Sequence, residues 1–229
     1  MVESVESSLH RRSALDVDAR VHAAGLGDWA YRAWGKRLTD LILVLLATPI
    51  VLPAIALLAI LVAVDSGRPF YAQTRVGRGG RSFTMWKLRT MVADADARLA
   101  RHLADNPAAA MEWEHRQKLR CDPRVTRLGA FLRATSLDEL PQLWNVLMGD
   151  MSLVGPRPIM ENQRALYSGR AYYALRPGVT GPWQVSDRNN SDFSARVGHD
   201  DAYLATMSLG SDMELMLRTV HVVLGRTGC

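Results

Sequence analysis

Two adjacent carboxylates, Asp138 and Glu139, precede an apolar segment and are the residues of this 229-residue chain best suited to chemistry. Neighbouring helical residues point about 100° apart, so the two cannot act as a matched pair on one face. We therefore expect one carboxylate to react and the other to orient the substrate or hold a metal. An aspartate is ionised at neutral pH and can attack phosphorus without a general base. The pair favours phosphate chemistry.

A second feature, the Gly155-Pro156-Arg157-Pro158 run, presents one arginine between two prolines. The planar guanidinium of Arg157 can offer two parallel hydrogen bonds to a phosphate. Phosphoryl transfer depends mainly on positioning and on neutralising charge, which calls for arginines and for Mg²⁺. The arginine and the carboxylate pair thus indicate the same class of reaction.

The residues around the carboxylates contain helix-start signals that allow two interpretations. Ser136-x-x-Glu139 fits a capping box, in which Glu139 would only bond to the backbone. A helix that starts at Asp138 instead places Pro141 in the first turn, where no N–H is needed, with both carboxylates at its positive end. Helical spacing and a glycine C-cap at Gly149 predict a core-facing stripe made of Leu140, Leu143, Trp144, Leu147 and Met148.

Residues 41–64 carry no charge. A straight helix over this range would be about 36 Å long, enough to cross a bilayer core of about 30 Å. Pro49 and Pro53 each remove a helical N–H, which predicts a break near these positions and a segment that re-enters on the same side. A spanning helix is the alternative. Lys36 and Arg37 before the segment, and several arginines after it, place both flanks on the cytoplasmic side.

The sequence predicts an α+β, mostly helical fold in three parts. Residues 1–28 are expected to form a flexible tail, 29–68 an interfacial and re-entrant membrane segment, and 69–229 a catalytic domain at the cytoplasmic face. Residues 69–76 and 82–88 read as strands of a short β-hairpin. Its glycine-rich turn could cradle a phosphate, although it lacks the P-loop pattern.

Residues 124–133 combine apolar and arginine side chains. This pattern fits an amphipathic helix lying in the membrane interface, but a helix packed on a protein core has the same signature.

The charge balance is basic, with a net charge of +5 and a pI near 9.5, and favours an acidic partner. Nucleic acid would explain the charge but not the apolar segment, so no nucleic-acid partner is expected. Cys121 and Cys229 lack metal-ligand spacing and are expected to be reduced thiols in a cytoplasmic compartment. No signal peptide is expected at the N-terminus.

From Lys36 almost to the C-terminus, the chain resembles the bacterial sugar transferase family, the monotopic phosphoglycosyl transferases. One matching piece is the proline-containing membrane segment. The others are the runs Pro69-Phe70-Tyr71-x-Gln73-x-Arg75-Val76-Gly77, Lys87-Leu88-Arg89-Thr90-Met91, Ser136-Leu137-Asp138-Glu139-Leu140-Pro141-Gln142 and Asp150-Met151-Ser152-Leu153-Val154-Gly155-Pro156-Arg157-Pro158.

This resemblance implies a role for each of these pieces. The membrane helix would turn at Pro53. Asp138 would be the nucleophile that forms a covalent phosphosugar intermediate and would bind Mg²⁺, with Glu139 beside it as a second catalytic residue. The phosphate-binding residues would be Lys87, Arg133 and Arg157.

The implied reaction transfers a hexose-1-phosphate, galactose or glucose, from a UDP-sugar to undecaprenyl phosphate and releases UMP. It would initiate exopolysaccharide assembly at the cytoplasmic face of the bacterial inner membrane, in contact with membrane lipid. The run from Arg176 to Ser186 resembles the longer members of the family, in which Gln184 and Arg188 would contact the substrate nucleotide. Asp187 stands where a glycine is usual, which leaves the detailed role of this loop open.

Two other functions remain as alternatives. A glycosyl transferase with a lipid acceptor would release UDP, and a non-catalytic membrane adaptor would use its arginines to bind anionic lipid. The sequence does not identify the sugar, nor whether the chain is a monomer or a homodimer.

Overall fold

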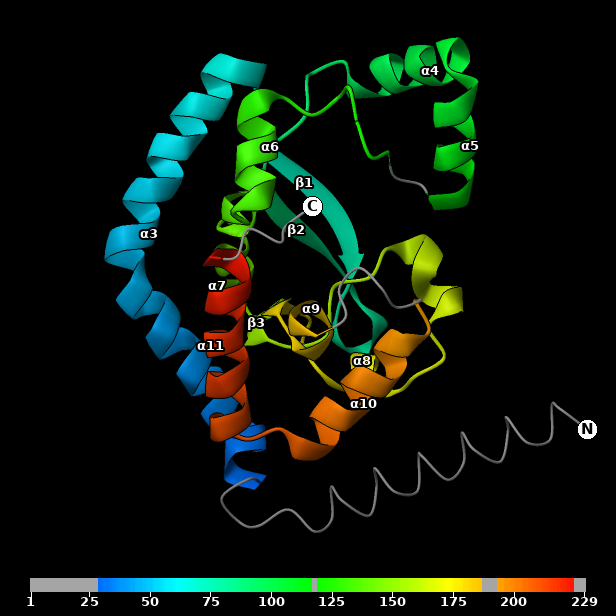
Figure 1. Ribbon diagram of the computed structural model, residues 1–229. Helices are drawn as coiled ribbons and strands as arrows, with labels where there is room; N and C mark the ends of the chain where they lie inside the picture. The colour runs from blue at the N-terminus through cyan, green and yellow to red at the C-terminus, as the bar shows by residue number, and fades with distance from the viewer. Residues whose placement is uncertain (1–28, 117–118, 187–192, 225–229) are drawn as a thin grey trace, which may run out of the picture. The chain divides into compact units, whose positions relative to one another are not determined.

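The computed structural model describes residues 29–116, 119–186 and 193–224. These residues form a mostly helical structure with two small two-stranded sheets (Figure 1), which confirms the predicted α+β class. The elements in chain order are η1 (Tyr31–Gly35), α3 (Lys36–Ser66), β1 (Phe70–Val76), η2 (Arg78–Gly80), β2 (Ser82–Leu88), α4 (Ala95–Asp105), α5 (Pro107–Arg116), α6 (Arg127–Ala134), η3 (Leu137–Glu139), α7 (Gln142–Met148), β3 (Ser152–Val154), η4 (Glu161–Leu166), α8 (Ala171–Ala174), β4 (Gly178–Thr180), α9 (Pro182–Val185), α10 (Ala195–Thr206) and α11 (Leu209–Leu224).

The chain divides into two compact units that alternate along the sequence. Unit 1 contains the described residues of Met1–Thr48, Gln73–Met85 and Gln142–Val222. Unit 2 contains those of Pro49–Ala72, Trp86–Pro141 and Val223–Cys229. The predicted tail at 1–28 lies outside the described residues.

Unit 1 is built around a parallel pair of short strands, β3 and β4, in which Ser152 pairs with Gly178 and Val154 with Thr180. Val154 is buried and packs in a cluster with Leu175, Tyr203 and Met207. Helix α10 contacts both α8 and α9, as Figure 1 shows in orange and yellow. The core of this unit therefore joins the strand pair to the C-terminal helices.

The first turn of α3 is tied to the rest of unit 1 by three charged side chains. Lys36 Nζ lies 2.6 Å from Asp212 Oδ2 on α11. Arg37 donates to the carbonyls of Val146 and Leu147, at the end of α7. Asp40 Oδ1 accepts from the backbone N–H of Leu153 at 3.0 Å. The basic residues that flank the apolar segment therefore also anchor it to this unit.

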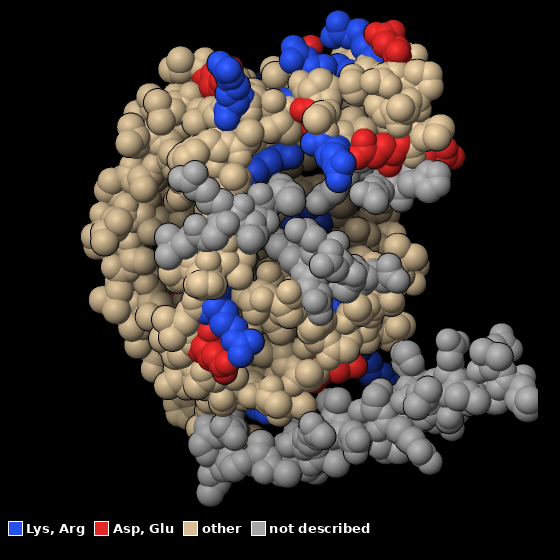
Figure 2. Space-filling view, viewed as in Figure 1, with Lys and Arg blue, Asp and Glu red and all other residues tan. Residues whose placement is uncertain are grey.

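Helix α3 continues through both Pro49 and Pro53, where the sequence predicts a break. A proline leaves one carbonyl unpaired and crowds the preceding turn, and a long helix can accommodate this without ending. The helical segment Tyr31–Ser66 is long and apolar enough to cross a membrane, judged by length and composition. Figure 2 shows an uncharged surface along the middle of the left edge, where α3 lies in Figure 1, and Ile50, Ile60 and Val64 are exposed.

Unit 2 has its own small core, in which Val62 of α3, Leu88 of β2 and Leu132 of α6 are buried. Helix α6 begins at a cap, because Thr126 Oγ1 accepts from the N–H of Gly129 at 2.9 Å. A Cβ at Gly129 would lie 2.0 Å from the carbonyl oxygen of Thr90, so only glycine permits this close approach. Phe131 on the same helix is exposed, so α6 has both a core face and an exposed apolar residue.

The core stripe predicted after the carboxylates is only partly correct. Leu143 and Leu147 pack against a buried cluster that contains Val146 and Met151, but Trp144 and Met148 are each 56% exposed. Helical spacing shows that a face is apolar, but it does not show what covers that face. Gly149 has φ +90° and its N–H bonds to the carbonyl of Asn145, which confirms the predicted C-cap.

Candidate active site

The two carboxylates lie in η3, a single 3₁₀ turn that precedes α7. Ser136, directly before the turn, has φ +56° and is the one non-glycine residue with positive φ in the described part of the chain. Within that part, the Ser136 side chain makes no capping hydrogen bond, so the capping-box interpretation is wrong. The α-helix starts at Gln142 rather than at Asp138, directly after Pro141. A left-handed residue in this place is strained, and such strain often accompanies a functional site.

Lys87, from the end of β2, contacts both carboxylates. Its Nζ atom lies 2.7 Å from Glu139 Oε1 and 3.8 Å from Asp138 Oδ2. All three side chains are largely buried, Asp138 being 8% exposed as a residue. The arrangement separates the roles of the carboxylates, because Glu139 makes the short ion pair and Asp138 the longer one.

Arg133, from the last turn of α6, is the second cation of this group. Its Nε donates to the hydroxyl of Thr90 at 2.9 Å, and Thr90 itself is buried. Burial lowers the pKa of Arg133, and the nearby Asp138 opposes that shift. Because the Thr90 hydroxyl holds only Nε, the terminal nitrogens of the guanidinium remain able to donate to a substrate phosphate.

Burial raises the pKa of the Asp138 carboxyl to about 6. The positive charge of Lys87 opposes this shift, the negative charge of Glu139 adds to it, and Arg133 opposes it. The carboxylate is therefore ionised at pH 7 while being poorly solvated. Such a group combines a negative charge with the low solvation that suits a nucleophile.

The fit of these residues to Mg²⁺ follows from their donor chemistry. Within the described ranges, no three His, Cys, Asp or Glu side chains gather as a metal cage. Mg²⁺ does not need one, since it is commonly held by one or two carboxylates together with substrate phosphates and water. Asp138 and Glu139 supply that number of oxygen ligands, so the residues fit an ion that arrives with a diphosphate.

The remaining predicted site residues belong to unit 1. Arg157 lies 5.8 Å from the ring centre of Trp183, and Arg196 lies 4.2 Å from the same ring. Gln184 is buried, and its Oε1 has no hydrogen-bond partner among the residues that the structure describes. Arg188 lies outside the described residues.

Two residues of these groups were not identified from the sequence. Thr90 belongs to the Lys87–Met91 run, but the sequence of that run does not indicate that the Thr90 hydroxyl accepts a hydrogen bond from Arg133. Arg196 shares the Trp183 ring with Arg157, and burial together with the charge of Arg157 lowers its pKa to about 10. Neither contact has a sequence signal, because each joins residues from different elements that no local periodicity relates.

Comparison with known proteins gives a match over most of the chain. The model of the family described as bacterial sugar transferase matches residues 31–226. A UDP-galactose-lipid carrier transferase of Erwinia amylovora is 46% identical over 195 residues, which cover 84% of this chain and 41% of that protein. The chain thus spans about two fifths of the length of this relative.

Two further relatives are closer in length. The exopolysaccharide production protein ExoY of Sinorhizobium fredii is 42% identical over 191 residues, 82% of this chain and 84% of that protein. A UDP-glucose:undecaprenyl-phosphate glucose-1-phosphate transferase of Caulobacter vibrioides is 40% identical over 200 residues, 82% of this chain and 69% of that protein.

Proposed function

The chain belongs to the bacterial sugar transferase family, and from this we propose that it transfers a hexose-1-phosphate from a UDP-sugar to undecaprenyl phosphate. The observation that carries the proposal is the buried Asp138 with Lys87 and Arg133 beside it. A structural ion pair would need neither a second cation nor a carboxylate of raised pKa. The names of the three relatives above support a sugar donor, a lipid-linked acceptor and a role in exopolysaccharide production.

In the proposed first step, an Asp138 carboxylate oxygen attacks the phosphorus that carries the sugar. The bond from that phosphorus to the oxygen bridging the two phosphates breaks, and UMP leaves with this oxygen. The product on the protein is an acyl phosphate, in which the carboxylate oxygen of Asp138 is bonded to the phosphorus of the sugar phosphate. Lys87 and Arg133 offset the charge that develops on the phosphate oxygens, which is the main contribution a protein makes to phosphoryl transfer.

In the proposed second step, a phosphate oxygen of undecaprenyl phosphate attacks the same phosphorus. The bond to Asp138 breaks, the carboxylate is regenerated, and the lipid-linked diphosphate sugar leaves. No proton needs to be removed, because the attacking phosphate is already an anion. Throughout, Glu139 keeps Lys87 in place through its 2.7 Å ion pair.

The negative charge of the donor's diphosphate must be neutralised, and its nucleotide must be bound by further side chains. Mg²⁺, held by Asp138 and Glu139 with diphosphate oxygens, would neutralise the negative charge of the donor. We propose Arg157, Gln184 and Arg188 as further substrate contacts, as the family resemblance implies. The free buried Oε1 of Gln184 supports this, because it can accept a hydrogen bond from a ligand.

We further propose that α3, which stays helical across Pro53, enters the inner membrane from the cytoplasmic side, turns near Pro53 by bending rather than by ending the helix, and returns to the cytoplasmic side. Residues 29–68 would form the membrane part and 69–229 the catalytic part at the cytoplasmic face. Cysteines placed at Ala30 and Phe70, in a background with Cys121 and Cys229 replaced by serine, should both be labelled from the cytoplasmic side. Labelling from opposite sides would mean that the helix spans the bilayer.

The reaction is tested by nucleotide release from purified protein with undecaprenyl phosphate, Mg²⁺ and a panel of UDP-sugars. We expect UMP from one sugar, and no UMP with Asp138→Asn. Donor labelled in the sugar phosphate should remain attached to the wild type when acceptor is omitted, and not to this variant. Release of UDP would indicate the glycosyl transferase instead. A protein that binds membranes but releases no nucleotide from any donor would favour the adaptor.

A further inference from the structure

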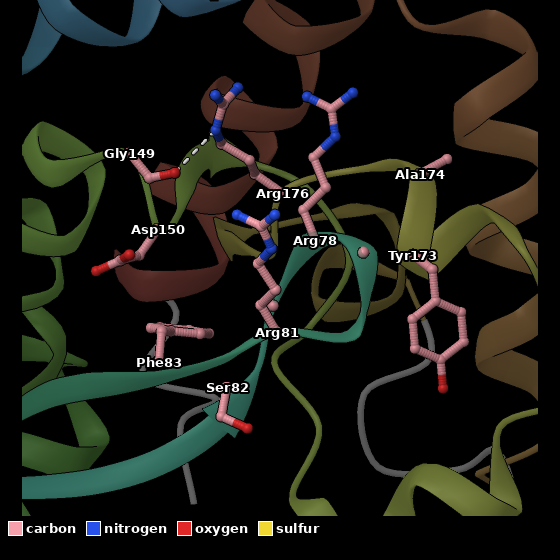
Figure 3. Close-up of a pocket in the computed structure, with 11 residues that line it drawn as sticks. Arg78, Arg81, Ser82, Phe83, Gly149, Asp150, Tyr173, Ala174 and Arg176 are labelled. Carbon is pink, nitrogen blue, oxygen red and sulfur yellow. Dashed lines mark hydrogen bonds between the residues drawn. The ribbon is translucent and has the colours of Figure 1, made fainter.

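A second cationic site lies in unit 1, at the glycine-rich turn of the hairpin. A cavity of about 600 Å³ is lined by Arg78 and Arg81 of this turn and by Arg176, which precedes β4. Figure 3 shows their guanidinium ends extending to the same side of the pocket, with Asp150 nearby. Three guanidinium groups thus face a single carboxylate.

The turn that carries Arg78 and Arg81 is held in place from several sides. The N–H of Gly77 bonds to the carbonyl of Arg81 at 2.7 Å, and Arg164 donates to the carbonyl of Gly80 at 2.6 Å. Gly79 and Gly80 both have positive φ, which allows the tight turn. The two arginines therefore extend from a preorganised backbone rather than from a free loop.

The three arginines differ in how their charges are used. Arg176 donates to the carbonyl of Gly149 at 2.9 Å and so helps to cap α7, which is a structural role (Figure 3). Within the described residues, no hydrogen bond or ion pair engages the side chains of Arg78 and Arg81. Burial lowers the pKa of Arg176, and the positive charges of Arg78 and Arg37 lower it further. A bound anion would relieve this repulsion.

A larger cavity adjoins the cationic one, with a lining that is mostly apolar but also contains Arg32, Lys36, Arg37 and Asp40. It measures about 1130 Å³ and shares Arg78, Ala174 and Arg176 with the first cavity. Its apolar lining includes Trp34, Leu38, Leu41, Leu204, Met207 and Leu209. Trp34 is 72% exposed, and the apolar side chains of Leu38, Ile42 and Leu45 on α3 are exposed as well.

We propose that these two cavities together bind an anionic glycerophospholipid, with its phosphate between Arg78, Arg81 and Arg176 and an acyl chain in the larger cavity. Asp150 and Ser82 line the cationic cavity and can bind hydroxyls of a headgroup such as glycerol. A nucleotide would use the arginines but leave the larger cavity unfilled. Lipid phosphate beside basic side chains at the membrane surface is favourable.

The proposal is tested by native mass spectrometry of the full chain in detergent with phosphatidylglycerol or phosphatidylcholine. We expect phosphatidylglycerol to bind about tenfold more tightly than phosphatidylcholine, and Arg78→Gln/Arg81→Gln to remove this preference. Trp34→Ala should weaken both lipids. The charge-matched control Arg98→Gln/Arg101→Gln, on exposed positions of α4, should bind as the wild type does.

Two results would overturn the lipid site. One is an unchanged preference for phosphatidylglycerol in Arg78→Gln/Arg81→Gln. The other is displacement of the lipid by equal concentrations of glycerol 3-phosphate or UMP, which would make the ligand a soluble phosphate. The assay contains no sugar donor and measures binding alone, so its outcome is independent of the proposed reaction. Both substituted arginines are exposed, so folding should be retained, and the thermal midpoint checks this.

Discussion

Lys87 Nζ lies 2.7 Å from Glu139 Oε1, although 52 positions separate the two residues in the chain. The same ammonium group is 3.8 Å from Asp138 Oδ2. Glu139 therefore takes the shorter ion pair, and Asp138 keeps a carboxylate that is buried, near a cation and less tightly bound. This asymmetry gives the two adjacent carboxylates different chemistry.

The first prediction concerns the acid side of the pH–rate profile. Burial raises the pKa of Asp138 to about 6, Lys87 opposes the shift and Glu139 adds to it. The rate should therefore fall as pH drops through about 6, because the nucleophile must be ionised. Lys87→Met should move this limb to higher pH and Glu139→Gln to lower pH. The measurement is UMP release between pH 5 and 8, with each profile normalised to its own maximum.

Absolute rates of both variants will be lower, so the positions of the limbs carry the test. If the acid side of the pH–rate profile shifted in the same direction in both variants, it could not be assigned to the ionisation of Asp138. Thermal midpoints across the same pH range control for loss of folded protein.

The second prediction concerns the hydrogen bond between Thr90 and Arg133. Thr90→Ala removes the acceptor for Arg133 Nε, so the guanidinium loses its orientation. A hydrogen bond worth about 1 kcal/mol corresponds to a fall of roughly fivefold in kcat/KM. Thr90→Ser keeps the hydroxyl and should retain most of the activity. Equal losses in both variants would show that the methyl group of Thr90, rather than its hydroxyl, is what matters.

A third prediction compares two helical glycines. Gly129→Ala would place a Cβ 2.0 Å from the Thr90 carbonyl oxygen, so α6 must shift and stability should fall by about 1–3 kcal/mol, as in an overpacked core. Gly198 on α10 has open space around its Cβ position, and Gly198→Ala should stabilise by about 0.5–1 kcal/mol. Thermal unfolding measures both. If Gly129→Ala were as stable as Gly198→Ala, the close approach of Gly129 to the Thr90 carbonyl oxygen would be excluded.

The fourth prediction concerns Asp200, which is buried and accepts a hydrogen bond from the Tyr167 hydroxyl at 2.7 Å. Burial raises its pKa to about 7, while Tyr167 and Arg196 oppose the shift and Asp201 adds to it. The folded state keeps this proton up to about pH 7, whereas the unfolded state loses it near pH 4. Its contribution to stability is therefore full below pH 4 and declines as pH rises through 7, by on the order of 3–4 kcal/mol.

Asp200→Asn should remove this decline, because the amide cannot ionise and its oxygen can still accept from Tyr167. Asp201→Asn is the matched control. It removes a neighbouring charge that raises the pKa of Asp200, so it should only move the decline to lower pH. Thermal midpoints between pH 4 and 8 measure these effects, and an unaltered slope in Asp200→Asn would rule out this residue as the source.

Several elements could be predicted from local patterns. The hairpin strands formed within a residue of their expected limits, because glycines at the turn and apolar alternation act over short range. The uncharged segment 41–64 is helical and exposes apolar side chains, as its composition requires. The expected break at Pro49 and Pro53 did not end the helix, because proline chemistry defines a local cost and not the response of the helix around it.

In the candidate site, too, some features could be predicted from the sequence and others depend on the tertiary structure. Residue types and spacing identified Asp138 and Glu139, since adjacent carboxylates suit phosphate chemistry, whereas Lys87 and Arg133 were expected only from the resemblance to the family. Only the tertiary structure decided that Lys87 pairs with Glu139 at 2.7 Å, that Thr90 holds Arg133, and that Asp138 is buried enough to raise its pKa.

The sequence by itself determined which groups can react and which segments are apolar, helical or extended. The tertiary structure decided which groups meet, how close they come and how much water reaches them. The reason is physical: periodicity and turn chemistry act between near neighbours, whereas an ion pair such as Lys87–Glu139 and the burial of Asp138 depend on packing between distant segments.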